Sequence, residues 1–206
     1  CGYLSFKCRD RCLCPRCCYR FLAGPLVDEF GDVVLAGIQS FYICISLNAN
    51  PDEAIRFKYR DFERADRDVV KGSRLCTPCN PAHYGIPFQT EDDIEQCRLV
   101  WKLFAEAIHE LTGTGRHQRF LGVVGGPELS MQFQPLRVIP HCNFVVWTSS
   151  FTEDDARELR RLIRAKFRNC RPLKKLRLYP SLACYRLRSR DDLRAVLSYS
   201  MKPIDL

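Results

Sequence analysis

The chain has 206 residues, of which 46% are hydrophobic and 11% aromatic, enough for one compact core with a small appendage or for two small domains. Its longest apolar runs, such as Phe144 to Trp147, fall far short of the ~20 residues that a membrane-spanning helix needs, and no basic-then-apolar leader follows Cys1. We therefore expect no membrane partner and an intracellular location, in the cytoplasm or the nucleus. The net charge of +8, from 32 basic and 24 acidic residues, indicates an anionic partner without choosing between DNA, RNA and a membrane surface.

The first 18 residues form a basic segment rich in cysteine. Among 13 cysteines in the chain, Cys14 and Cys17 are separated by two residues, the spacing that lets two thiolates bind one zinc ion from a tight turn. We expect structural Zn²⁺ on four thiolates: Cys1, Cys8, Cys14 and Cys17. Other candidate ligands are Cys12, Cys18 and the similarly spaced pair Cys76 and Cys79. Reduced, unliganded cysteines or a redox pair are the alternative interpretation.

The pattern that follows predicts a connecting helix within residues 19–30 and then a buried strand, Phe41 to Leu47. We divide the chain into residues 1–32, the zinc-binding knuckle with its connecting helix, and residues 33–206, a second domain. Residues 52–89 are highly charged and then rich in proline, so we expect an insertion or long loop there.

Thr90 and Asp93 form a capping box that predicts the start of a helix, and Gly113 predicts its end. Its apolar positions are Ile94, Cys97, Val100, Trp101, Phe104, Ile108 and Leu111. Further along, the chain predicts strands at Phe120–Val124 and Val138–Trp147, the first followed by Gly125-Gly126-Pro127. A helix from Thr152 to about Phe167 has an apolar face of Ala156, Leu159, Ile163 and Phe167. One or two strands within 176–187 and a helix over 189–201 complete an α+β fold, with helices packed on a mainly antiparallel sheet.

Basic residues crowd together between Arg157 and Arg177. A solvated helix face would mix the two signs of charge more evenly, so we expect this stretch to contact phosphates. The candidate DNA-binding residues are Arg157, Arg160, Arg161, Arg164, Lys174 and Lys175.

The segment from Pro140 to Trp147 carries the most informative pair of polar residues. Residues two apart in a strand share a face, so His141 and Asn143 project together and could hold a divalent cation, although a polar pair near a strand end also occurs without function. In the last predicted helix, Tyr199 and Lys202 are three residues apart and share a helix face. Tyr199 could equally be a rim residue of an amphipathic helix.

These segments, in this order, resemble the HUH endonucleases: rolling-circle replication initiators, relaxases and related transposases. Their first motif is an apolar strand with small hydroxyl residues, similar to Ile43–Leu47, where Cys44 replaces the common threonine. Their second motif, histidine-hydrophobic-histidine on a strand, resembles His141 to Asn143, with asparagine in place of the second histidine. Their third is a tyrosine followed by a lysine on a helix, as in Tyr199 and Lys202. The segment Cys8–Cys17 is similar to the cysteine knuckle before this domain in some members.

The resemblance implies an RRM-like HUH fold and an enzyme that nicks single-stranded DNA and transfers the strand. Tyr199 would attack a phosphodiester to give a 5′-phosphotyrosine, and Lys202 would contact a phosphate or the departing oxygen. Mg²⁺ or Mn²⁺ would be held by His141, Asn143 and Glu128, since related initiators often place an acidic residue just upstream of the histidine motif; Gln132 and Gln134 are alternatives. The expected partners are single-stranded DNA or a DNA hairpin, with a helicase domain or protein, in replication or transposition.

Two other classes of function compete with this one. The first is a non-catalytic, zinc-containing nucleic-acid-binding module with a degenerate HUH site, which the replacement by Asn143 favours. The second is a zinc-containing, primase-like polymerase, which the sequence disfavours because no strand carries paired aspartates able to hold two catalytic metal ions.

Overall fold

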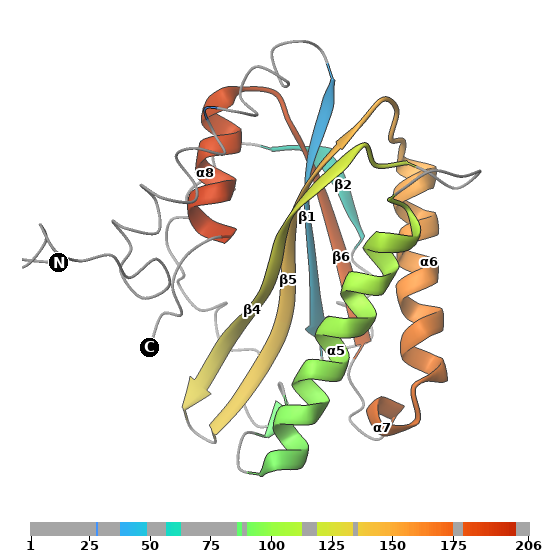
Figure 1. The fold of residues 1–206 in the computed structure, drawn as a ribbon, viewed down its shortest axis with the longest axis vertical. Coiled ribbons are helices and arrows are strands. Elements are labelled where there is room, and N and C mark those ends of the chain that lie inside the picture. Colours follow the sequence, from blue (N-terminus) through green and yellow to red (C-terminus); the bar gives the residue numbers. More distant parts are fainter. Residues whose placement is uncertain are drawn as a thin grey trace, which may run out of the picture.

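The computed structural model describes Asp28 and residues 38–48, 57–62, 86–87, 90–112, 119–133, 136–174 and 179–200 (Figure 1). Its strands are β1 (Gln39–Asn48), β2 (Lys58–Asp61), β3 (Ile86–Pro87), β4 (Gly122–Phe133), β5 (Leu136–Thr148) and β6 (Tyr179–Leu187). Its helices are α5 (Glu91–Glu110), α6 (Glu153–Asn169), α7 (Arg171–Lys174) and α8 (Arg190–Ser200). The segments 1–27 and 63–85, which include the predicted zinc ligands and the pair Cys76 and Cys79, lie outside the described residues.

The described strands form one mixed sheet in the order β2-β6-β1-β5-β3, with β4 also pairing with β5. The pairing of β2 with β6 is parallel, and those of β1 with β5 and β6, and of β5 with β3 and β4, are antiparallel. This confirms the predicted α+β class, with helices packed on a mainly antiparallel sheet.

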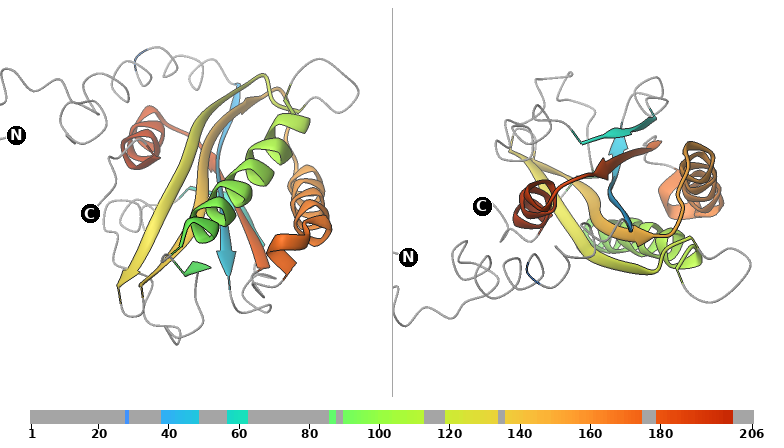
Figure 2. Two further views of the ribbon diagram at one scale, coloured as in Figure 1. Left: turned by 60° about the horizontal axis from the view of Figure 1, so that its bottom comes forward. Right: turned by 90° about the horizontal axis from the view of Figure 1, so that it is seen from above.

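The two faces of the sheet are covered by different helices. One face carries Phe41, Ile43 and Ile45 of β1 and packs against α5 and α6 in the larger core cluster. The other carries Tyr42 of β1 and packs against α8 in a smaller cluster. Figures 1 and 2 show α8 across the sheet from α5 and α6.

The predicted capping box at Thr90 is present, and a second one, which was not predicted, begins α6. The Thr90 hydroxyl accepts from the backbone N–H of Asp93, whose carboxylate accepts from the N–H of Thr90, and Thr152 and Asp155 repeat the arrangement at α6. The predicted apolar face of α6 is entirely buried. On α5, most of the predicted apolar positions are buried or half-buried, whereas Ile94 in the first turn of the helix is 38% exposed.

Helix α8 begins with a reciprocal pair of the same kind. Ser189 Oγ accepts from the backbone N–H of Asp192 at 3.1 Å, and Asp192 Oδ2 accepts from the N–H groups of Arg188 and Ser189. Asp192 is only 3% exposed, and these hydrogen bonds compensate its carboxylate for the loss of water. The helix is thereby fixed directly after β6.

Strand β4 continues through Gly125, Gly126 and Pro127, where we expected the first strand to have ended at Val124; that boundary is wrong. Gly125 adopts a φ of 148°, and a Cβ atom built there would lie 2.0 Å from the carbonyl oxygen of Asn143 on β5. Only glycine therefore lets the two backbones pair at this point. The glycines extend the strand rather than end it.

The segment 52–89, expected to be an insertion or loop, contributes β2 and β3 to the sheet. β2 pairs with β6, about 120 residues away in the sequence, and β3 pairs Ile86 with Val138 of β5. Neither strand was predicted, because β2 is short and charged and β3 has only two residues in a proline-rich stretch.

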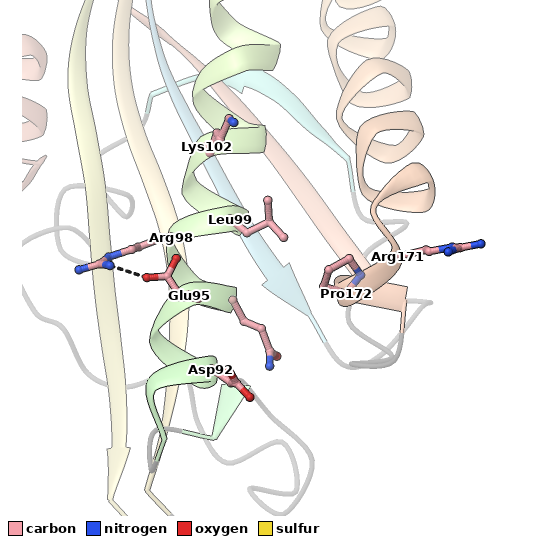
Figure 3. A pocket seen from close by; sticks show the side chains of 8 residues that line it. Asp92, Glu95, Arg98, Leu99, Lys102, Arg171 and Pro172 are labelled. Carbon is pink, nitrogen blue, oxygen red and sulfur yellow. Dashed lines mark hydrogen bonds and ion pairs between the residues drawn. The ribbon is translucent and has the colours of Figure 1, made fainter.

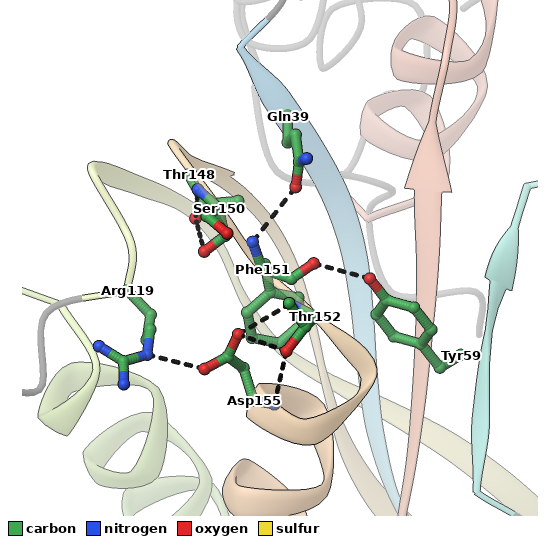
Figure 4. A network of polar contacts seen from close by, with 8 residues as sticks. All are labelled: Gln39, Tyr59, Arg119, Thr148, Ser150, Phe151, Thr152 and Asp155. Carbon is green, nitrogen blue, oxygen red and sulfur yellow. Dashed lines mark hydrogen bonds and ion pairs between the residues drawn. The ribbon is translucent and has the colours of Figure 1, made fainter.

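A polar network joins the start of α6 to three strands (Figure 4). The N–H of Phe151 donates to Gln39 Oε1 at 3.2 Å, and Tyr59 Oη donates to the Phe151 carbonyl at 2.7 Å. Arg119 Nε donates to Asp155 Oδ1 at 2.8 Å. Burial alone would raise the pKa of Asp155, but the hydrogen bonds from Thr152 and Arg119 outweigh it and hold the pKa below its ordinary value of 3.8.

Replacing Gly125 with alanine should lower the free energy of unfolding by about 2 kcal/mol or more, because the side chain meets the β5 backbone at a φ that L-residues rarely adopt. Gly126→Ala is the matched control, since a Cβ there meets open space, and it should change stability by no more than about 0.5 kcal/mol. Urea denaturation of the three proteins measures both effects. Equal stability of the two variants would contradict the tight approach at Gly125.

Asp155→Ala should lower the free energy of unfolding at pH 7 by roughly 1–2 kcal/mol, because a capping box and an ion pair are lost. The pKa of Asp155 is lowered by folding, so its contribution is full above the unfolded pKa and disappears as the pH falls through the folded pKa. The difference between wild type and variant should therefore shrink below pH 3.8 in chemical denaturation series. Asp154→Ala, at an exposed neighbouring position, is the control and should change the free energy of unfolding at pH 7 by no more than about 0.5 kcal/mol.

Candidate functional site

The alternation of β5 divides its side chains between the two faces as predicted. Cys142, Phe144 and Val146 belong to the larger core under α5 and α6. Val145 and Trp147 belong to the cluster under α8, and His141 and Asn143 lie on the same face because they are separated from these residues by even numbers of positions. His141 is 6% exposed and Asn143 is 1% exposed, so both polar side chains need partners inside the protein.

Glu128 supplies one of those partners from the neighbouring strand. In the antiparallel register of β4 and β5, Glu128 lies directly opposite His141, and its Oε2 is 3.0 Å from His141 Nε2. His141 Nδ1 lies 3.1 Å from the carbonyl oxygen of Ile139. A carbonyl can only accept, so Nδ1 carries a hydrogen and Nε2 faces the carboxylate.

Asn143 joins the same group through both ends of its carboxamide. Its Nδ2 donates to Glu128 Oε2, and its Oδ1 accepts from Tyr42 Oη at 2.7 Å. Tyr42 comes from β1, 101 residues away, and is itself 4% exposed. Three strands therefore contribute to one hydrogen-bonded chain, which runs from Tyr42 through Asn143 and Glu128 to His141.

Glu128 exposes these hydrogen-bonded residues to solvent through its side chain and is bonded to helix α5, across the sheet, through its backbone. Its side chain is 25% exposed, and beside it a Cβ atom at Gly126 would meet open space. Its backbone carbonyl accepts from Trp101 Nε1 of α5 at 3.3 Å, which ties this part of β4 to the helix behind the sheet. A ligand can therefore reach the carboxylate from one side while α5 holds the strand from the other.

The donor set fits a divalent cation once the Asn143 carboxamide turns its oxygen toward Glu128. A carboxylate oxygen, an amide oxygen and an imidazole nitrogen suit Mg²⁺ or Mn²⁺, and the Nδ1–H bond to Ile139 is the kind of contact that orients a metal-binding histidine. Within the described ranges, no three His, Cys, Asp or Glu side chains gather into a metal-binding group, so a cation site here would have to include the amide oxygen of Asn143.

Cys44 lies next to this group but keeps its proton. It is paired with Asn143 in the register of β1 and β5. Burial and the nearby charge of Glu128 raise the pKa of the Cys44 thiol to about 12, against smaller opposing contributions from a hydrogen bond with Tyr42 and from the charge of Lys58. The thiol is therefore a hydrogen-bonding group at neutral pH rather than a thiolate ligand.

Helix α8, which contains Tyr199, packs on the face that carries the candidate site. Leu193, Val196 and Leu197 are fully buried in the cluster with Tyr42 and Val145. In Figure 1, α8 runs beside β4 from the upper end of the sheet toward its middle. The backbone of Tyr199 belongs to α8, whereas its side chain and the whole of Lys202 lie outside the described part of the chain.

The predicted DNA-binding arginines lie on α6, across the sheet from Glu128, His141 and Asn143. Arg157 and Arg160 lie over the ring of Phe57, at 5.9 and 5.8 Å from its centroid, and Arg157 pairs with Glu153. Burial, followed by the charges of Arg164 and Arg157, lowers the pKa of Arg160. Arg161 and Lys174 are exposed, and Lys175 lies outside the described residues.

Strand β2 carries two further basic residues, which were not predicted, on the sheet face that holds Glu128, His141 and Asn143. Lys58, Ala183, Cys44 and Asn143 form one row across four neighbouring strands, so Lys58 lies about 14 Å from Asn143 at the usual strand spacing. The guanidinium of Arg60 lies 5.3 Å from the centroid of the Tyr185 ring. Phe57, whose ring lies under Arg157 and Arg160 of α6, directly precedes β2. Basic groups of α6 and of β2 therefore lie near each other at this edge of the sheet.

A separate pocket of about 840 Å³ lies on the side of α5, between that helix and α7 (Figure 3). Its lining carries charges of both signs: Asp92, Glu95, Arg98, Lys102 and Arg171. Arg98 pairs with Glu95, and Lys102 with Glu106 on the next turn. The pocket lies across the sheet from the candidate site and adds no residue to it.

The other residues considered in the sequence as alternative ligands or histidines lie as follows. Gln132 belongs to β4 by its backbone, and Gln134 lies outside the described residues, so neither is tested as an alternative to Glu128. His109 is exposed in the last turn of α5. Tyr42 and Trp101 were missed, since their roles rest on contacts between distant parts of the chain.

No protein-family model matches the chain, and neither the curated proteins nor the solved structures include a match. Among the described helices, none is long and apolar enough to cross a membrane.

Wild-type protein should bind Mn²⁺, and His141→Ala should weaken that binding by more than the roughly 10- to 100-fold that is lost when a group hydrogen-bonded to a metal ligand is removed. Isothermal titration or Mn²⁺ electron paramagnetic resonance measures the affinity. His109→Ala removes an exposed histidine outside the site and should leave the affinity unchanged. Equal weakening by both substitutions would show that the ion binds elsewhere.

Proposed function

We propose that this protein nicks single-stranded DNA and transfers the strand through a covalent bond to Tyr199, with Glu128, His141 and Asn143 holding Mg²⁺ or Mn²⁺. The observation that supports it is the meeting of these three residues, from two strands, on the sheet face packed against the tyrosine-bearing helix. This is the order of strand, ligand pair and tyrosine helix in the HUH endonucleases, which the motifs of this chain resemble.

In the proposed reaction, the Tyr199 hydroxyl gives up its proton to solvent as its oxygen forms a bond to the phosphorus of a DNA phosphodiester, while the bond from phosphorus to the 3′ oxygen breaks. The 3′ oxygen leaves and takes up a proton, and the 5′ phosphate stays on the tyrosine. Attack by a free 3′-hydroxyl reverses these bond changes and joins the strand. A bound divalent cation supplies polarisation of the phosphate oxygens and stabilises their developing charge. Glu128 and His141 would position that ion, and Lys202 would contact a phosphate or the leaving oxygen.

Single-stranded DNA or a DNA hairpin is the proposed partner, with a helicase domain or protein acting beside it in replication or transposition. The path we propose for the strand crosses the β2 edge, since Lys58 and Arg60 lie on the site face and Arg157 and Arg160 lie just around that edge. Each phosphate neutralised there releases counterions and adds affinity that does not depend on sequence.

Structural Zn²⁺ on Cys1, Cys8, Cys14 and Cys17 remains part of the proposal and concerns residues outside the described part of the chain. We also propose an intracellular, reducing location. The cysteines of the described ranges, Cys44, Cys97, Cys142, Cys170 and Cys184, support it because they are free thiols.

One observation favours a second function, a nucleic-acid-binding module without catalysis. Tyr42 and Glu128 already satisfy both ends of the Asn143 carboxamide, so the group is stable with no ion present. If the carboxamide keeps this orientation, its oxygen is unavailable to a cation, and the protein would hold DNA without cutting it.

Incubating wild-type protein with a pool of single-stranded and hairpin DNA and Mn²⁺ should give a covalent adduct that mass spectrometry locates on Tyr199. Tyr199→Phe should abolish the adduct, because phenylalanine has no attacking oxygen. Tyr179→Phe is the matched control, since Tyr179 is 40% exposed at the start of β6 and should not be needed. DNA binding by wild type with no adduct under any of these conditions would establish the binding module instead.

A further inference from the structure

The Asn143 carboxamide has two possible orientations within its hydrogen-bonded chain. In the one observed, Nδ2 donates to Glu128 and Oδ1 accepts from Tyr42. A half-turn about the Cβ–Cγ bond exchanges the two ends and directs the oxygen toward Glu128 and His141. A cation between Glu128 and His141 would be repelled by the amide N–H groups and attracted by the amide oxygen, so it favours the second orientation.

The Tyr42 hydroxyl can serve both orientations. As a donor it satisfies the amide oxygen, and as an acceptor it can satisfy the amide nitrogen, simply by rotating its own O–H bond. Asn143 is 1% exposed and Tyr42 is 4% exposed, so water does not replace this partner readily.

The ring of Tyr42 is held in place, and a change of its hydroxyl from donor to acceptor needs only a rotation of the O–H bond. The ring stacks on Tyr185 with centroids 6.0 Å apart, and it belongs to the buried cluster with Leu193 and Leu197 of α8.

We propose that Tyr42 is a positioning residue that lets Asn143 switch between a hydrogen-bond donor to Glu128 and an oxygen ligand of a divalent cation. This inference rests on the proposed function and deepens it, since it explains how an asparagine can serve where related sites have a second histidine. Tyr42 touches neither the cation nor the DNA and acts only through Asn143.

The test is the Mn²⁺ affinity of four proteins: wild type, Tyr42→Phe, Asn143→Ala and the double variant. With phenylalanine at position 42, the amide nitrogen of the ion-bound state has no buried acceptor, and unpaired buried N–H groups are tolerated less well than carbonyls. Tyr42→Phe should therefore weaken Mn²⁺ binding about tenfold, the smallest loss that is usual when a group hydrogen-bonded to a metal ligand is removed. In the Asn143→Ala background, the same substitution should change the affinity less than about twofold.

Tyr185→Phe is the control, since it removes a hydroxyl from a half-buried ring on the same face that is not hydrogen-bonded to Asn143. It should bind Mn²⁺ as wild type does. Equal losses from Tyr42→Phe with and without the Asn143 side chain would show a merely structural role and overturn the proposal.

A measurement on wild type alone keeps the test valid if Tyr42→Phe folds poorly. Addition of Mg²⁺ should shift the side-chain ¹⁵NH₂ resonances of Asn143, because their acceptor changes from the Glu128 carboxylate to the Tyr42 hydroxyl. Unchanged resonances with Mg²⁺ bound would overturn the switch. Mn²⁺ binding with the expected cycle but no DNA adduct would refute the proposed nuclease and leave the role of Tyr42 standing, whereas no binding of either ion would overturn both.

Discussion

The pairing of Glu128 with His141 across β4 and β5 is the contact on which the rest of the candidate site depends. A slip of one residue in this register would turn Glu128 to the opposite face, among the apolar side chains under α5. The register requires β4 to pass directly beside Asn143, which the missing side chain of Gly125 permits. One glycine therefore lets a carboxylate, an imidazole and an amide meet inside a sheet.

The sheet tolerates these polar groups because its two faces are covered differently. The face under α5 and α6 is apolar along β1 and β5, whereas α8 covers only part of the other face. His141, Asn143 and Tyr42 lie beside the α8 cluster, where they are buried yet fully hydrogen-bonded. A buried polar group costs little free energy when its donors and acceptors have partners. The row of hydrogen-bonded side chains that links Tyr42 to His141 is therefore stable without an ion.

Features fixed by short stretches of sequence were predicted well, and those fixed by distant contacts were not. The predicted capping box at Thr90 involves residues three apart, and the alternation of β5 needs only its own residues. Glu128 was found through the family resemblance rather than through any local pattern. β2 was missed because a short charged segment becomes a strand only through β6, and Tyr42 because its partner lies 101 residues away.

In the motif that this chain resembles, a second histidine stands where this chain has Asn143, and an asparagine at the proposed site would have to accept an ion differently. A neutral imidazole presents a lone pair or an N–H at a given nitrogen according to its tautomer, so exchanging them moves a proton. A carboxamide exchanges acceptor for donor by a half-turn and moves none. The amide oxygen is also a harder ligand than a second imidazole, which favours Mg²⁺ more strongly. The proposed nuclease and the binding module therefore differ physically in whether the buried Asn143 side chain completes that half-turn when an ion arrives, and the hydroxyl of Tyr42 is the group placed to allow it.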